Sequence, residues 1–370
     1  MKLIFKKSDL TSAVNIAMRA VPSKTTMSIL ECFLIDATTN EIKFSSNDME
    51  LGIMTTVQGE ILEKGVIAVE AKIFSEIVRK LPDNEITITT DSNLQLHITC
   101  EKAKFSIPGR SGDDFAYIPM LEKDKFIYLS QFNLKEIIRQ TLFSISDNEN
   151  NKIMTGELFE VKDNTLKVVS LDGHRISIRK LELKENFEDT RVIVPGKTLN
   201  EISKILSGGN DEEVRVFFTA NHIIFEFNET IVVSRLIEGE YYKIEQMLSS
   251  DYETKISVNK REFLDAIDRS TLLVRDSDKK PIIITIEDGN MELQIKSSMG
   301  SMDENIFVEK TGKDMMIGFN PKFLIDALRV IDDENVTIYL LNAKAPCLIK
   351  NDGEDYIYLI LPVNFNVNSR

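Results

Sequence analysis

The residues most capable of chemistry form one tetrapeptide, Asp172-Gly173-His174-Arg175. A carboxylate beside a histidine could work with it as a general base, and on a strand Asp172 and His174 would share one face. A three-domain hydrolase that uses this pair is therefore one hypothesis. However, no nucleophile stands in a recognisable frame, and no serine carries a G-x-S-x-G motif. A structural or binding role for the tetrapeptide is favoured, and we expect no catalytic residue.

The motifs of other common sites are missing from the sequence. It has no P-loop, no G-x-G-x-x-G and no metal-ligand spacing. Its three cysteines are far apart and form no C-x-x-C pair, which argues against a disulfide framework and fits a reducing cytoplasm. The N-terminus has lysines where a signal peptide is apolar, and no stretch is long and apolar enough to span a membrane. We expect a cytoplasmic protein without metal or cofactor.

A second pattern places similar charges on three segments. The trio Lys72, Glu76 and Arg79 returns as Lys197, Glu201 and Lys204, and again as Lys322, Asp326 and Arg329. On a helix this spacing allows ion pairs along an exposed face. The alternative is a basic face, present three times, that contacts a phosphate backbone. The net charge of −14 opposes nonspecific binding of nucleic acid, so this alternative requires the two signs to lie on different surfaces.

The segments that carry these charges recur at a fixed period. The three lysines Lys72, Lys197 and Lys322 lie 125 residues apart, twice over, and each is followed by a similar acidic and strand-like run. A repeat of this length has the size of a domain and is too long for a solenoid unit. Short polar connectors separate the copies. We therefore predict three domains, of residues 1–123, 124–250 and 251–370.

Hydrophobic periodicity predicts the same elements in each third. Apolar residues at helical spacing indicate one helix near the start of each domain and a second helix that begins near each of the three lysines. Alternating segments bounded by turns, such as 85–90 and 291–295, indicate antiparallel strands. Candidate helix N-caps are Ser8 with Asp9, Asn133, and Asn259. The predicted fold class is α+β, with three tandem copies of one domain.

The repeat and several short anchors resemble the bacterial sliding clamp family, the beta subunit of the replicative DNA polymerase III. The anchors are Met1-Lys2-Leu3-Ile4-Phe5, Val21-Pro22-Ser23-Lys24-Thr25 with Ile29-Leu30, the tetrapeptide at 172–175, and Leu361-Pro362-Val363. The resemblance covers the whole chain in order. It implies the DNA-clamp fold, with helices inside and antiparallel sheets outside, and a homodimer joined head to tail as a ring. It also implies a non-catalytic processivity factor that encircles duplex DNA and slides on it.

The resemblance implies several partners. Besides a second copy of the chain and duplex DNA of any sequence, these are the replicative polymerase catalytic subunit, the clamp loader, repair polymerases and mismatch-repair proteins. The proteins are expected to bind as short linear peptides in an apolar pocket between the second and third domains. The pocket residues carried over from the family are Met154, Thr155, Leu171, Gly173, His174, Arg175, Ile176, Tyr242, Met247, Leu361, Pro362 and Val363.

Two further sets of residues follow from the resemblance. The residues expected to face DNA are Lys24, Lys72, Arg79, Lys80, Arg139, Lys197, Lys204, Lys322 and Arg329. The residues expected at the dimer interface are Lys104, Phe105, Ile107, Leu272, Leu273, Asp303 and Glu304. Phe105 and Ile107 alternate onto one face of a strand, and an edge strand is free to pair with another chain. The alternative is that these two side chains belong only to the core.

The sequence departs from the family pattern at three positions. Tyr242 stands in the place of a proline, Asn364 in the place of an arginine, and Ser28 in the place of another proline. The first two positions lie beside the expected pocket, so the peptide preference is expected to differ while the fold does not. A protein-binding scaffold without a DNA role is a third hypothesis.

Overall fold

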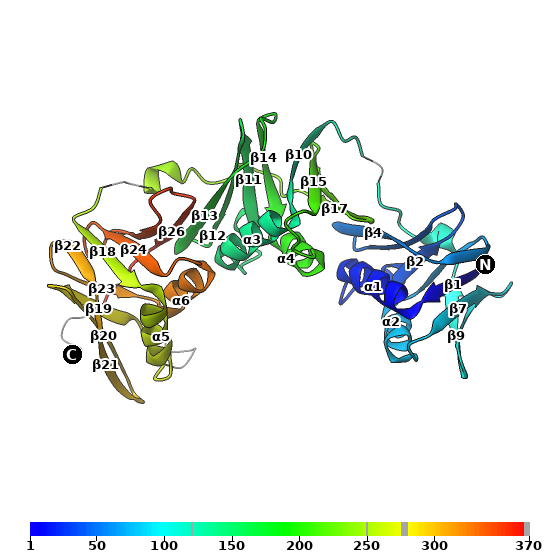
Figure 1. Cartoon of the computed structure of the whole chain (residues 1–370), viewed down its shortest axis with the longest axis horizontal. Helices are drawn as coiled ribbons and strands as arrows, with labels where there is room; N and C mark the ends of the chain where they lie inside the picture. The colour runs from blue at the N-terminus through cyan, green and yellow to red at the C-terminus, as the bar shows by residue number, and fades with distance from the viewer. Residues whose placement is uncertain (120, 249–250, 275–279, 366–370) are drawn as a thin grey trace. The chain divides into compact units, whose positions relative to one another are not determined.

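The structure, a computed structural model, describes residues 1–119, 121–248, 251–274 and 280–365. It confirms the mixed fold and the three copies (Figure 1). In chain order each copy runs strand, helix, three strands, a further strand, helix and three strands. The first and third copies each add one short strand, β5 (Glu60–Glu63) beside β1 (Lys2–Lys6) and β22 (Glu309–Gly312) beside β18 (Thr254–Asn259).

The remaining elements have the following bounds. In the first copy they are α1 (Lys7–Ala17), η1 (Met18–Ala20), η2 (Ser28–Glu31), β2 (Cys32–Asp36), β3 (Ile42–Asn47), β4 (Leu51–Val57), β6 (Val66–Glu70), α2 (Ala71–Lys80), β7 (Glu85–Thr90), β8 (Gln95–Cys100), β9 (Ala103–Arg110) and η3 (Gly112–Asp114). In the middle copy they are β10 (Lys125–Ser130), α3 (Gln131–Thr141), η4 (Leu142–Ser144), η5 (Lys152–Thr155), β11 (Gly156–Lys162), β12 (Thr165–Leu171), β13 (Arg175–Glu182), β14 (Thr190–Pro195), α4 (Gly196–Ile205), β15 (Glu213–Phe218), β16 (His222–Phe227), β17 (Thr230–Arg235) and η6 (Glu245–Met247). In the third they are α5 (Lys260–Thr271), β19 (Ile282–Glu287), β20 (Asn290–Ser297), β21 (Gly300–Phe307), β23 (Met315–Phe319), α6 (Pro321–Val330), β24 (Asn335–Leu340), β25 (Cys347–Lys350) and β26 (Tyr356–Ile360).

The chain groups into two compact units, and strands of the middle copy occur in both. The first unit holds Met1–Lys135 and Lys197–Leu236, and the second holds Glu136–Gly196 and Ile237–Arg370. The reason is the pairing of strands from neighbouring copies, because β17 is hydrogen-bonded to β4 in the first unit and β26 to β13 in the second. The predicted boundaries after residues 123 and 250 stay predictions, and residue 250 lies outside the described residues.

Each unit builds antiparallel sheets that are covered by helices on one face. In the first unit the strand order is β10-β15-β16-β17-β4-β3-β2-β6-β9-β8-β7-β1-β5. In the second unit one sheet has the order β14-β11-β12-β13-β26-β25-β24-β18-β22 and a smaller one has β21-β20-β19-β23. Helix α1 packs against α2, β3 and β4, and helix α5 packs against α6, β20 and β21 (Figure 1).

The cores of the three copies differ at one equivalent position. Phe33, Glu157 and Ile282 are each fully buried, and each lies opposite the residue two before the second helix of its copy. Phe33 belongs to a cluster of four phenylalanines with Phe5, Phe44 and Phe74. The middle copy therefore buries a carboxyl group where its neighbours bury an aromatic ring and an aliphatic side chain.

The predicted N-caps are partly wrong. Asn259 caps α5, because its Oδ1 accepts a hydrogen bond of 3.1 Å from the backbone N–H of Glu262. Helix α1, by contrast, begins directly after β1 with no side-chain cap, and Ser8 instead donates to Asp9. At the start of α3, Ser130 takes the role predicted for Asn133, whose backbone N–H donates to the Ser130 hydroxyl at 3.1 Å. The cap lies one residue before the helix, and apolar spacing does not determine that boundary.

None of the helices among the described residues is both long and apolar enough to cross a membrane. The same residues contain no group of three or more His, Cys, Asp or Glu side chains arranged to hold a metal ion.

Candidate functional site

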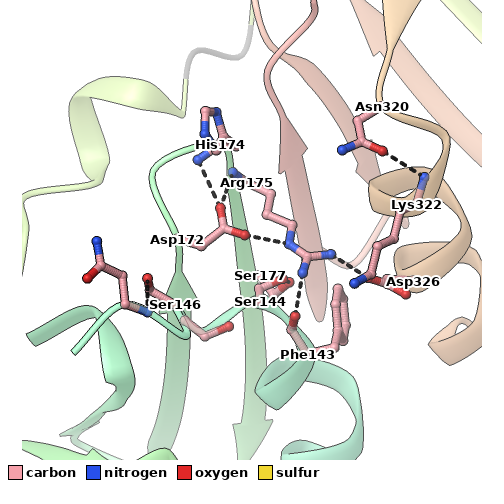
Figure 2. A network of polar contacts seen from close by, with 12 residues as sticks. Phe143, Ser144, Ser146, Asp172, His174, Arg175, Ser177, Asn320, Lys322 and Asp326 are labelled. Atoms are coloured by element: carbon pink, nitrogen blue, oxygen red, sulfur yellow. Dashed lines mark hydrogen bonds and ion pairs between the residues drawn. The ribbon is translucent and has the colours of Figure 1, made fainter. Parts of the chain in front are cut away.

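A buried arginine organises the region around the tetrapeptide 172–175 (Figure 2). The Arg175 Nε donates to Asp172 at 2.9 Å, Nη1 donates to Asp326 at 2.7 Å, and Nη2 donates to the carbonyl of Phe143 at 2.6 Å. The guanidinium group also lies over the ring of Phe323, 4.6 Å from its centroid. A buried cation is stable only when its donors are satisfied, so Arg175 fixes β13 to α6 and to η4, which follows α3.

Asp172 forms a turn and does not serve as a general base. Its Oδ1 accepts hydrogen bonds from the backbone N–H groups of His174 and Arg175 at 2.9 and 3.1 Å. Gly173 has a φ of 89°, a left-handed conformation that glycine adopts without steric cost. The expectation that Asp172 and His174 share a strand face is wrong, because both lie in the turn before β13. The Asp172 carboxylate is used to hold the backbone and Arg175.

The His174 ring is placed by an aromatic contact. It is exposed and stacks on Phe323, with ring centroids 6.0 Å apart and planes at 22°. This arrangement provides a flat surface beside the buried arginine, whose guanidinium lies over the same Phe323 ring. It is suited to contact with a ligand, and it lacks the acid–base pair that the hydrolase hypothesis requires.

An apolar wall continues from this turn. Leu171 and Ile176 are buried in a cluster that also contains Tyr241 and Ile244, and Met154 packs on it from η5. The Tyr241 hydroxyl donates to the carbonyl of Val169 at 3.1 Å. Burial raises the pKa of Tyr241, and the nearby Glu157 adds to that effect. The wall is therefore held by the connection that follows β17 as well as by strands β12 and β13.

The rim of this region is formed by exposed or half-buried side chains. Met247 in η6 is 53% exposed, and Leu361 is 37% exposed. The Leu361 backbone N–H donates to the carbonyl of His174, and the Val363 N–H donates to that of Gly318. Thr155 and Pro362 are half-buried. All twelve residues expected at the pocket lie in the second unit.

Two of the three sequence departures have hydrogen-bond partners. Tyr242, in the place of a proline, is exposed, and its hydroxyl accepts a hydrogen bond from Asn151 at 2.7 Å. Asn364 is exposed. Ser28 begins η2, and its hydroxyl accepts a hydrogen bond from Arg110 at 2.6 Å. Tyr242 thus replaces a rigid ring with a hydrogen-bonded aromatic side chain at the rim.

Sequence reasoning missed three residues of this region: Phe143, Phe323 and Asp326 as a partner of Arg175. Asp326 was recognised only as part of the charge pattern on its helix. Its contact with Arg175 joins residues 151 positions apart, and no local spacing encodes it. Phe323 precedes the periodic apolar positions of α6, so its contact with His174 could not be inferred from the buried stripe.

The predicted DNA-facing residues are mostly exposed on helices. Where the structure describes the chain, Lys24, Lys72, Arg79, Lys80 and Lys322 are exposed and have no carboxylate within ion-pair distance. The predicted helix ion pairs occur at Lys204, which contacts Glu201 at 2.7 Å.

Three other cations of the set have carboxylate partners. Lys197 pairs with Asp48, Arg329 pairs with Asp268 at 3.3 Å, and Arg139 pairs with Glu136 and, at 2.7 Å, with Asp332. In the first unit Lys24 and Lys197 line a polar cavity of about 540 Å³ together with Arg19. Exposed ion pairs of this kind contribute little free energy.

The residues expected at the dimer interface lie on strand β9, on strand β21 and directly after helix α5. On β9, Lys104 and Phe105 are exposed, Phe105 by 41%, whereas Ile107 is 9% exposed and packs in the core. Ile107 thus packs in the core, as the alternative had it for this residue, and the assignment of Phe105 and Ile107 to a dimer interface stays a prediction. Beyond its pairing with β8, β9 contacts β6 only at Gly109 and Arg110 among the described residues.

The other edge is β21, at the end of the smaller sheet in the second unit. Within the described residues β21 pairs with β20 alone. Phe307 is 72% exposed and Leu272 is 76% exposed, and Leu273 is half-buried. Asp303 accepts a hydrogen bond from Gln294, and Glu304 is held by Arg269, whose hydrogen bonds lower the pKa of the Glu304 carboxyl.

Comparison with known proteins identifies the family. Three family models, for the N-terminal, central and C-terminal domains of the DNA polymerase III beta subunit, match residues 1–119, 128–243 and 245–364. The beta sliding clamp of Staphylococcus epidermidis is 32% identical over 98% of this chain and 99% of its own. The crystal structure of the Bacillus subtilis DNA polymerase sliding clamp is 31% identical, with a TM-score of 0.95 over 99% of this chain and all of that one.

A Eubacterium rectale protein described by crystallography as a DNA polymerase III beta subunit is 65% identical, with a TM-score of 0.96 over 99% of this chain and 100% of that chain. The matches cover every copy of the repeat and preserve the order of the elements. The chain belongs to the bacterial DNA polymerase III beta subunit family, the beta sliding clamps.

Proposed function

We propose that this protein is a sliding clamp, a non-catalytic processivity factor of the replicative DNA polymerase that acts in the cytoplasm. Two molecules of the protein join head to tail, close around duplex DNA and tether the polymerase. Membership of the beta sliding clamp family supports this function. The three copies of the repeat within each molecule are the domains predicted at residues 1–123, 124–250 and 251–370.

One observation carries the proposed assembly, namely the use of sheet edges. Copies are joined within the chain by the pairs β4–β17 and β13–β26, each of which links the edges of two adjacent copies. Among the described residues, the corresponding strands are β9 in the first copy, whose residues 103–108 pair with β8 alone, and β21 in the third, which pairs with β20 alone. Unpaired edges favour association with another chain. Pairing of β9 with β21 of a second chain would repeat the same junction.

The chemistry of the two edges supports this pairing. The β9 edge carries Lys104 and exposed Phe105, and β21 carries Asp303, Glu304 and exposed Phe307. Opposite charges suit antiparallel neighbours, and the apolar side chains would be removed from water. A head-to-tail contact of this kind closes into a ring when the rotation permits.

Sequence-independent binding of DNA is assigned to the exposed cations of the helices. Lys72, Arg79 and Lys80 on α2 and Lys322 on α6 are exposed, and no carboxylate of the described residues lies within ion-pair distance of them. Lysine and arginine contacts to phosphates do not read base sequence and therefore permit sliding. Lys24, Arg139, Lys197, Lys204 and Arg329 complete the set.

The region around Arg175 is assigned to short linear peptides. A half-exposed methionine, an aromatic stack and an apolar wall fit the side chains of such peptides, and a methionine adapts to different shapes. The partners are the polymerase catalytic subunit, the clamp loader, repair polymerases and mismatch-repair proteins. Arg175 acts as a positioning residue here, because its donors are already used inside the protein.

The assembly is tested by sedimentation and by retention on DNA. We expect a dimer mass, and after loading we expect retention on circular duplex and release once the circle is cut. The variant Phe307→Asp should shift the equilibrium to monomer, while Tyr252→Asp, at another exposed aromatic residue of the third copy, should not. A wild-type monomer at high concentration, or equal retention on cut and intact circles, would contradict the ring.

The pocket is tested with a fluorescent peptide from the polymerase catalytic subunit of the same organism. Met247→Ala and removal of residues 361–370 should each weaken binding by about tenfold while the dimer persists. Met27→Ala, at a methionine of similar exposure in the first unit, is the matched control. Unchanged peptide affinity in both pocket variants would reject the assignment.

A further inference from the structure

The junction β4–β17 in the first unit repeats the backbone of the proposed peptide site. Asp48 accepts hydrogen bonds from the N–H groups of Glu50 and Leu51 at 3.0 and 2.7 Å, as Asp172 does in the other turn. Met49 has a φ of 76° in the position of Gly173. The Arg235 N–H donates to the Glu50 carbonyl at 2.9 Å, just as Leu361 donates to His174. The two junctions are therefore equivalent, residue by residue.

The connections beside the two junctions also correspond. Phe115 and Tyr241 are both buried aromatic residues, and each is followed three positions later by an isoleucine that packs on an apolar cluster. In the first unit that isoleucine, Ile118, lies against Gly52, where a Cβ would approach it to 2.8 Å. The larger Ile176 occupies the place of Gly52 in the second unit. Glycine at position 52 therefore leaves room for the segment that contains Ile118.

A cavity of about 280 Å³ lies at this junction. Its lining includes Met49, Tyr117, Pro119 and Val233, and its polar residues include His222 and Arg235. Met49 and Tyr117 are more than half exposed at its edge. The cavity is held open from behind by Asn47, whose side chain accepts from the Met49 N–H at 2.7 Å and donates to the Ala116 carbonyl at 3.1 Å. The apolar edge is therefore preformed.

The charges at this cavity differ from those of the proposed peptide site. Arg235 takes the place of Leu361, and it is exposed with no carboxylate within ion-pair distance among the described residues. Glu50 precedes β4 and also lines the cavity, and its carboxylate forms no ion pair with Arg235 among the described residues. Burial and the charge of Arg235 lower the pKa of His222, which leaves Arg235 as the cation facing the cavity from β17.

We propose that this cavity is a second docking site for a short linear peptide, one that carries a bulky apolar side chain next to an aspartate or glutamate. The apolar side chain enters between Met49 and Tyr117, and the carboxylate pairs with Arg235. The choice of a peptide rests on the proposed function of the equivalent junction. The required acidic residue distinguishes the two sites, because the proposed first site has Leu361 where this one has Arg235.

The proposal is tested by methyl NMR on the full chain labelled at methionine. Two of its 13 methionines report separately on the two sites, Met49 on this cavity and Met247 on the other. Met49→Leu and Met247→Leu assign the two signals. The probe is a pool of acetylated tetrapeptide amides with Leu or Phe followed by Asp or Glu, and glycine elsewhere. We expect a saturable shift of the Met49 methyl signal.

Variants of Arg235 test the recognition of the carboxylate. Arg235→Glu should weaken the Met49 response by about tenfold, and Arg235→Lys should retain most of it. Arg215→Glu, at an exposed arginine of β15, has the same charge change and should have no effect. A circular dichroism melt of each variant confirms that the fold is intact.

The outcomes separate this proposal from the proposed function. A response at Met247 alone leaves the first site standing and overturns this one, whereas a response at Met49 alone supports this one, and the first site is then decided by the fluorescent polymerase peptide. No response at Met49, or one that Arg235→Glu leaves unchanged, overturns the proposal. A Met49 shift produced by a 20-base-pair duplex and not by the peptides would assign the cavity to nucleic acid and overturn it as well.

Discussion

The first and middle copies of the repeat bury different chemistry at the same point of the fold. Phe33 contacts two other phenylalanine rings, whereas Glu157 has no hydrogen-bond partner for either carboxylate oxygen among the described residues. Burial raises the pKa of Glu157 to about 8, so the group is protonated at neutral pH. Thr141 lies nearby, but its hydroxyl donates to the Ile137 carbonyl at 2.7 Å.

Other features at equivalent places are shared by the two copies. The Ser46 hydroxyl donates to the Ala17 carbonyl, and the Ser170 hydroxyl donates in the same way to that of Thr141. The comparison teaches that the repeat preserves the backbone pairing and the polar contacts that support it. The buried side chains at equivalent positions differ in kind between the copies, even where a polar side chain lowers the stability.

The largest effect is expected when the middle copy's carboxyl is moved into the first copy. Phe33→Glu removes an aromatic ring from a close-packed cluster and buries a carboxyl group without a partner. We expect a loss of about 5 kcal/mol or more in the free energy of unfolding, or an unfolded first unit. Urea unfolding followed by circular dichroism measures it, since the chain has no tryptophan.

Phe33→Ala is the control for the lost ring and should cost about 3–5 kcal/mol. If Phe33→Glu is no worse than Phe33→Ala, the two cores tolerate a carboxyl equally well. The contrast between the copies would then not lie in their polarity.

The next effect is the pH dependence that Glu157 confers. The unfolded chain loses this proton near pH 4.5, but the folded protein keeps it up to about pH 8. Stability from this group is therefore complete below pH 4.5 and falls as the pH rises to about 8, by about 4 kcal/mol. Glu157→Met should remove this fall, so that the variant exceeds the wild type most at pH 8.5.

Urea midpoints of the wild type and Glu157→Met at pH 5, 7 and 8.5 check this expectation. Glu160→Met changes a neighbouring carboxylate of β11 that is not fully buried and serves as the control. An equal slope with pH in wild type and Glu157→Met would mean that Glu157 is ionised in the folded protein.

A smaller effect compares the buried ion pair of Arg175 with an exposed ion pair. Asp326→Ala leaves Nη1 of the buried Arg175 without its acceptor and should cost about 2–3 kcal/mol. Asp268→Ala removes an exposed ion pair with Arg329 and should cost less than about 1 kcal/mol. Thermal melts of both variants compare them, and equal costs would show that the Arg175 network contributes no more than a surface pair.

Much of the fold could be predicted because local patterns in the sequence indicate its helices and strands. The helices that begin near Lys72, Lys197 and Lys322 lie where the apolar spacing predicts them, and the repeat predicts three similar copies. The first residues of helices were less predictable, since Ser8 and Asn133 resemble caps but lie inside the helices.

The candidate site was only partly accessible from the sequence. Its members followed from the resemblance to a family, not from spacing. The contacts of Arg175 with Asp326 and Phe323 depend on how α6 packs against β13, which no local pattern encodes. Glu157 was missed because an acidic residue is normally exposed, whereas the first four residues of β11 are all buried.

The pairing of β4 with β17 limits how this protein can be cut for study. A fragment ending at residue 123 would retain the whole first copy. It would lose β17, the strand whose backbone pairs with Gly52, Ile53 and Met54 of β4. Such a fragment would expose fresh backbone donors along a strand rich in aliphatic side chains and would tend to precipitate. Dissection at the copy boundaries therefore requires a substitute strand in trans, such as a peptide of residues 230–235.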